Sequence, residues 1–137
     1  MGVDFLNAHE RHWDDAEILY IFEKWANADQ LYGISAECGV KSLMCAFGMS
    51  MDSVKQKPSL SADRQHIGLL GQRYDAYRSQ LYATQYQIDF SAFSNWDIGQ
   101  RYVHESDITQ ANVQLHREAT EAIRETMKQA KLNGVLQ

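Results

Sequence analysis

Apolar residues between Asn27 and Gly48 recur on two sides of a helical projection, so this stretch has no wide polar face. One seam consists of Leu31, Ile34, Cys38 and Cys45, and the opposite seam of Ala36, Val40, Leu43, Met44 and Phe47. A ridge of small residues lies between the seams: Ser35, Gly39, Ser42 and Ala46. A helix that is apolar on nearly all sides is typical of a buried position, so the pattern predicts the central helix of a bundle.

A first helix is predicted before this central one, and a loop after it. Helical spacing of apolar residues runs from about Asp4 to Trp25, with a break at Ala26 and a capping box of Asn27 and Gln30. Gly48 stands where a helix commonly ends. Residues 49–62 contain one proline and four serines, which favours an irregular connection.

Two more helices complete the predicted fold. One extends from about Asp63 to Tyr86, and the last begins near a cap signature of Asp107 and Gln110 and ends at Asn133–Gly134. Residues 89–106 between them are rich in aromatic side chains and lack a clear period, apart from a short helix predicted over 96–102. The sequence therefore predicts an all-α, antiparallel up-and-down four-helix bundle with an irregular or short-helical segment before its last helix.

Length and composition restrict the class of protein further. The chain has 137 residues, which predicts a single domain over 1–137 with one core. No run of eighteen apolar residues occurs, and the charged N-terminus does not resemble a signal peptide, so we expect a cytoplasmic protein without membrane contact. The net charge of −5 argues against an indiscriminate nucleic-acid coat, although a local basic site is compatible with it.

Two sets of polar residues on the helices have structural explanations. Glu37 and Lys41 form an i,i+4 pair in the favoured order, and we expect a partly buried ion pair that fixes the register of the bundle. His9 and His12 lie near several carboxylates, but no Glu is followed by His three residues later, as a di-iron bundle site would require. A site completed by His66, His104 or His116 stays open, and no resident metal or cofactor is predicted.

The most distinctive chemical cluster precedes the last helix and contains Trp96, Arg101, Tyr102 and His104. Arginine offers a planar fork for phosphate, histidine exchanges a proton near neutral pH, and aromatic rings stack on bases. In a helix Arg101 and His104 would share a face. By spacing alone, an arginine that caps a neighbouring helix and a solvated histidine explain the same residues.

Two stretches resemble the HEPN superfamily of small prokaryotic helical domains. Residues 35–43, SAECGVKSL, are similar to the signature AAExxLKAL of that family, and residues 15–19 with 25–28 resemble its preceding helix and turn. The resemblance covers most of the chain and implies a four-helix bundle that is often dimeric and binds or acts on RNA or nucleotides. It also implies a toxin–antitoxin or defence system with a nucleotidyltransferase-type partner protein.

Active HEPN ribonucleases cleave RNA without a metal through an arginine and a histidine at a longer interval, whereas two residues separate Arg101 from His104. The resemblance therefore predicts a module that binds RNA, nucleotide or a partner protein through a homodimer-interface cleft containing Arg101. Trp96 and Tyr102 are the other predicted ligand-binding residues. Two alternatives stay open: a metal-independent ribonuclease with Arg101 and His104 as catalytic residues, and a metal-binding bundle that uses His9 and His12.

Overall fold

The computed structural model describes all residues from Met1 to Gln137. Its α-helices are α1 (Phe5–Ile21), α2 (Trp25–Ala46), α3 (Gly71–Leu81) and α4 (Gln110–Leu132), and a small antiparallel sheet pairs β1 (Met51–Asp52) with β2 (Lys57–Pro58). Five 3-10 helices complete it: η1 (Ser61–Asp63), η2 (Ile67–Leu69), η3 (Ser91–Asn95), η4 (Ile98–Tyr102) and η5 (Glu105–Asp107). The prediction of a mostly helical chain is confirmed.

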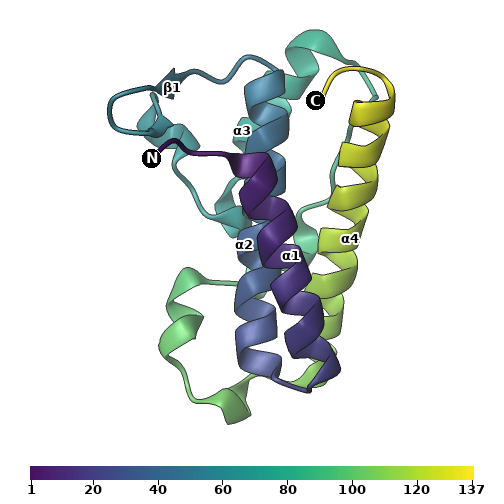
Figure 1. The fold of residues 1–137 in the computed structure, drawn as a ribbon. Coiled ribbons are helices and arrows are strands. Elements are labelled where there is room, and N and C mark those ends of the chain that lie inside the picture. Colours follow the sequence, from purple (N-terminus) through teal and green to yellow (C-terminus); the bar gives the residue numbers. More distant parts are fainter.

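Helix α2 occupies the centre of the molecule, as its two apolar seams predicted. Figure 1 shows α1 and α4 beside it, with α1 running in the opposite direction to both. Most residues of α2 are buried, and Val40, Leu43 and Met44 belong to the main core. Burying apolar side chains of this size stabilises a fold by roughly 1.5–3 kcal/mol each. Helix α2 therefore contributes much of the core and packs against both α1 and α4.

Glycines on α2 permit close contact with two neighbouring segments. A Cβ atom at Gly33 would lie 1.9 Å from the ring of Trp96, and one at Gly39 would lie 2.8 Å from Nδ1 of His9. Either contact is too short for a real Cβ atom, so both positions require glycine unless the neighbour moves. Gly39 belongs to the small-residue ridge in the sequence, which indeed receives a side chain of α1.

The boundary between α1 and α2 differs from the prediction. Helix α1 ends at Ile21 and α2 begins at Trp25, so the break comes earlier than Ala26. Glu23 has a φ of 59°, in the left-handed region, and this conformation reverses the chain. The predicted capping box of Asn27 and Gln30 is therefore wrong, because both residues lie inside α2.

The other predicted helix ends have mixed outcomes. Gly48 and Gly134 have φ values of 107° and 74° and follow the C-caps of α2 and α4, so these two stops are confirmed. At the start of α4, however, the capping side chain is Thr109, which accepts from the backbone N–H of Asn112. The predicted cap, Asp107, belongs instead to η5.

The third helix is much shorter than predicted. Two 3-10 helices, η1 and η2, lie within residues 61–69. The buried carboxylate of Asp63 holds η1 against α3 by accepting from Arg73 Nε at 2.6 Å and from the Tyr77 hydroxyl at 2.6 Å. The end of α3 is fixed by Arg78, whose Nη1 donates to the carbonyls of Tyr82, Ala83 and Gln85. Long-range side-chain bonds of this kind override the local helical pattern.

Ion pairs and hydrogen bonds connect the three long helices. Arg117 of α4 donates both Nε and Nη2 to the carboxylate of Glu17 on α1, and Tyr32 of α2 donates its hydroxyl to the same carboxylate. Burial would raise the pKa of Glu17, but these hydrogen bonds outweigh it and lower the pKa. No helix combines the length and apolar character needed to cross a membrane.

Candidate functional site

A cavity of about 690 Å³ lies at the end of the molecule where α1 turns into α2. Figure 1 shows the green segment that carries η4 and η5 at this same end. We call it the Arg101 cavity. Its lining comes from the α1–α2 turn, from η4 and η5, and from the start of α4: Glu23, Lys24, Trp25, Ala26, Asn27, Gln100, Arg101, Val103, His104, Glu105, Ser106, Ile108, Thr109 and Gln110.

Arg101 and Tyr102 form a pair at the edge of this cavity. The guanidinium carbon of Arg101 lies 4.8 Å from the centroid of the Tyr102 ring, within the range of a cation–π contact. Arg101 forms no ion pair, and the Tyr102 side chain is 80% exposed. The guanidinium N–H groups of Arg101, one of the predicted ligand-binding residues, are therefore available to donate to a ligand.

His104 lines the same cavity as Arg101, so the two predicted catalytic residues are brought together. Its Nδ1 accepts from the backbone N–H of Ser106 at 3.2 Å and lies 2.8 Å from the Ser106 hydroxyl. A neutral imidazole that accepts at Nδ1 carries its proton on Nε2. In this tautomer His104 donates a hydrogen bond to an anionic oxygen but does not accept a proton from a hydroxyl.

The N-terminus of α2 contributes unpaired backbone donors to the cavity wall. Lys24 is the N-cap and makes no side-chain cap bond, and the first N–H to bond its carbonyl is that of Ala28. The amides of the first turn, residues 25–27, consequently have no partner within the helix. Unpaired amides and the helix dipole together attract anions.

The charges around the cavity are balanced. Lys24 and Arg101 supply two fixed cations, while Glu23 and Glu105 supply two carboxylates. Attraction for an anion therefore depends on the local position of the α2 N-terminus and Arg101, not on net charge. Trp25, half-buried and packed against Tyr20 at 5.2 Å between ring centroids, adds an aromatic ring to the wall.

Trp96 does not line the cavity. Its side chain is 4% exposed, lies against Gly33 and donates Nε1–H to the carbonyl of Asp29 at 2.9 Å. The prediction that Trp96 binds a ligand is therefore corrected, because a ring enclosed by the core offers no face for stacking. Trp25 is the cavity tryptophan that sequence reasoning missed.

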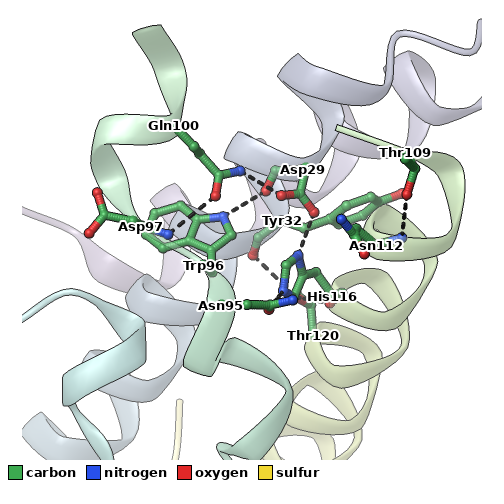
Figure 2. Close-up of polar contacts among 10 residues, drawn as sticks. All are labelled: Asp29, Tyr32, Asn95, Trp96, Asp97, Gln100, Thr109, Asn112, His116 and Thr120. Carbon is green, nitrogen blue, oxygen red and sulfur yellow. Dashed lines mark hydrogen bonds and ion pairs between the residues drawn. The ribbon is translucent and has the colours of Figure 1, made fainter. Parts of the chain in front are cut away.

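Figure 2 shows a buried polar cluster that includes Gln100, which is also a lining residue of the cavity. The carboxylate of Asp29 bonds Nδ1 of His116 at 2.5 Å and accepts from Nε2 of Gln100 at 2.5 Å. On its other side His116 has Nε2 at 2.7 Å from Oδ1 of Asn95. The cluster joins α2, η3, η4 and α4. No local sequence pattern predicts it, because Asp29 and His116 are 87 residues apart.

His9, one of the two histidines proposed as metal ligands, has other partners in the structure. Nδ1 of His9 lies 2.7 Å from the carbonyl of Ser35, and its Nε2 lies 3.1 Å from Nη1 of Arg124. Nδ1–H therefore donates to the carbonyl, and Nε2 accepts from the guanidinium. No group of three or more His, Cys, Asp or Glu side chains is arranged to hold a metal ion. The metal-binding alternative gains no support from this arrangement.

Glu37 and Lys41 form an ion pair with a distance of 3.0 Å between Nζ and Oε2, and their side chains are 15% and 8% exposed. The other oxygen, Oε1 of Glu37, lies 2.9 Å from Nδ1 of His66 near η2. The pair thus connects α2 to the segment before α3. Its role in fixing the register of the bundle stays a prediction.

Comparisons with family models, curated proteins and solved structures found no match for this chain. The resemblance to HEPN proteins therefore stays a prediction, and the geometry of the cavity is the basis for inferring a function.

Proposed function

We propose that this chain is a HEPN-like helical-bundle module that binds a phosphate group of a nucleotide or RNA in the Arg101 cavity. The observation that carries the proposal is the convergence of Arg101, Lys24 and the uncapped N-terminus of α2 on one cavity, with neither cation in an ion pair. Arginine binds phosphate through two parallel hydrogen bonds, and backbone amides at a helix N-terminus provide further donors.

The balance of charges supports a compact phosphate group over a long stretch of nucleic acid. Affinity for a long nucleic acid depends on many accumulated cations, whereas this cavity has two, opposed by two carboxylates. Trp25 provides a surface for a base, and Glu23 and Glu105 provide acceptors for hydroxyl or amino groups.

From the resemblance we further expect a homodimer whose interface includes the cavity, within a toxin–antitoxin or defence system with a nucleotidyltransferase-type partner. Exposed apolar side chains at the cavity edge support an interface here. Ile21 and Phe22, which are 73% and 70% exposed, directly precede Glu23 of the lining, and Tyr102 lies between Arg101 and Val103.

Ribonuclease activity is the less supported alternative. A general base at position 104 would have to accept the ribose 2′-hydroxyl proton, but Nδ1 already accepts from the N–H of Ser106, so neutral Nε2 is protonated. Catalysis by Nε2 would require the ring proton to move from Nε2 to Nδ1. Binding of an anion through the Nε2–H donor requires no change of tautomer.

Arg101→Ala tests the proposed site with two probes, ADP and a 5′-phosphorylated RNA trinucleotide, measured by calorimetry at fixed salt. We expect the affinity to fall at least about tenfold, because a charge-assisted hydrogen bond is lost. Arg11→Ala is the matched control, since Arg11 is exposed on α1 and does not line the cavity.

Equal affinity of wild type and Arg101→Ala for both probes would refute the site. Incubating the RNA with protein and a chelator in the same series tests the ribonuclease alternative. Cleavage products that disappear with His104→Ala would favour it over binding alone.

A further inference from the structure

Asp29 is a buried junction at which three separate segments meet. The residue is 1% exposed, and each of its three side-chain and backbone oxygens bonds a different partner. Oδ1 bonds His116 on α4, Oδ2 accepts from Gln100 on η4, and the carbonyl accepts from Trp96 between η3 and η4 (Figure 2). A buried carboxylate held by several donors is fixed in one orientation.

Two of these three bonds hold the segment that carries Arg101. Gln100 precedes Arg101 directly, and its Oε1 accepts from the N–H of Asp97, which closes a capping box at the start of η4. Neither η4 nor η5 contains a buried residue, and Ile98 is only half-buried. The attachment of this segment to α2 therefore depends largely on Trp96 and on the Gln100–Asp29 bond.

His116 holds Asp29 from the opposite side. Its ring is 2% exposed and stacks on Phe93 with 5.7 Å between ring centroids and an angle of 9° between the planes. The ring forms no other ion pair, and its remaining nitrogen faces Asn95. The carboxylate is thus held by α4 and η3 through bonds that do not involve Gln100.

We propose that Asp29 is the positioning residue that presents Arg101 to the phosphate group bound in the cavity, through its bonds to Gln100 and Trp96. This inference rests on the proposed function. Asp29 itself does not line the cavity, so its effect on a ligand must pass through η4.

An exchange of hydrogen-bond partners tests the link. Asp29→Ala removes the oxygen that accepts from Gln100, and Gln100→Glu places two carboxylates together. Each of these variants alone should weaken binding of ADP about tenfold. The double variant Asp29→Asn, Gln100→Glu instead pairs an amide donor with a carboxylate. The double variant restores one donor and one acceptor, so its affinity should return to within about threefold of wild type.

Asp63→Asn is the matched control. Asp63 is a fully buried carboxylate that also accepts bonds from two side chains, but it holds η1 and α3 and not the cavity. Its substitution should lower the thermal stability without changing affinity for ADP. In an Arg101→Ala background Asp29→Ala should have no further effect on affinity, since Asp29 acts through Arg101.

Hydrogen exchange in the absence of ligand separates this proposal from the proposed function. Asp29→Ala should accelerate exchange of the Gln100 and Val103 amides at least about tenfold, because the side-chain bond that holds η4 is lost. Asp63→Asn should leave these rates unchanged. Unchanged rates in Asp29→Ala, or a double variant as weak as Gln100→Glu alone, would overturn the proposal even if ADP binds. Failure of ADP and RNA to bind the wild type would refute the proposed function and the role in ligand presentation together.

Discussion

Individual polar side chains inside this protein are held in one protonation state by their partners. His9 is 1% exposed, donates Nδ1–H to the carbonyl of Ser35 and accepts from Arg124 at Nε2. Burial lowers the pKa of His9, the bond to Ser35 opposes that shift, and the nearby Arg124 guanidinium adds to it. The neutral ring is therefore part of the packing between α1, α2 and α4.

This arrangement predicts a loss of stability in mild acid. Below the unfolded pKa of 6.5 the unfolded chain binds a proton at His9 that the folded chain does not bind until lower pH. The free energy of unfolding should therefore fall as pH decreases from 7.5 to 5.5. Urea unfolding over this range should give a shallower pH dependence for His9→Gln than for wild type.

The pKa of His12, on the same helix, is also lowered by burial, so His12→Gln should remove a second and additive part of the slope. Identical slopes for wild type and both variants would contradict this account.

The helices differ in how their ends are stabilised. Asp4 caps α1 by accepting from the N–H of Asn7 at 2.9 Å, and Thr109 caps α4, but α2 begins without a capping side chain. An uncapped start leaves amides free, which weakens the helix end and creates the donors of the Arg101 cavity. Burial of α2 compensates for this weakness, because most of its residues pack against the other elements.

Removing the capping side chain of α1 should lower the stability of the protein more than removing another exposed carboxylate of the same helix. Asp4→Ala is expected to lower stability by about 1 kcal/mol, or roughly 3 °C in Tm, since the N–H of Asn7 loses its partner. Asp14→Ala is the control, because Asp14 is exposed on the same helix and makes no side-chain hydrogen bond. Equal Tm changes in a thermal scan would indicate that Asp4 contributes only charge.

At the scale of the whole molecule, the cavity end combines exposed apolar and charged groups. Ile21 and Phe22 are largely exposed beside the lining residues Glu23 and Lys24. Apolar side chains that are clustered next to a cavity are typical of binding surfaces. This arrangement agrees with the proposal that two copies meet at the cavity.

Sedimentation equilibrium should therefore give about twice the mass of one chain, and the Ile21→Ser, Phe22→Ser double variant should increase the monomer fraction. Leu132→Ser is the matched control, since Leu132 is 71% exposed, comparable with both residues, but lies at the far end of α4. A monomeric wild type at high protein concentration would refute the dimer.

Much of the fold could be predicted from local patterns. The seams of α2 predicted its central position, and Gly48 and Gly134 marked helix ends, because helical periodicity and positive φ are local properties. The predicted start of α2 is wrong because Asn27 and Gln30 match a capping pattern but lie inside the helix. The chain already reverses at Glu23, so α2 begins at Trp25. The length of α3 depended on Asp63 and Arg78, whose partners lie outside the helix pattern.

The sequence by itself determined the helical class, the buried middle helix and the grouping of Arg101, Tyr102 and His104, because residues adjacent in sequence stay close in any fold. Only the tertiary structure decided that Trp96 belongs to the core, that Lys24 and Trp25 line the same cavity as Arg101, and that Asp29 meets His116 and Gln100. Those contacts join residues far apart in the chain, and their bonds form only when the packing of α2 removes water and leaves each polar atom one partner.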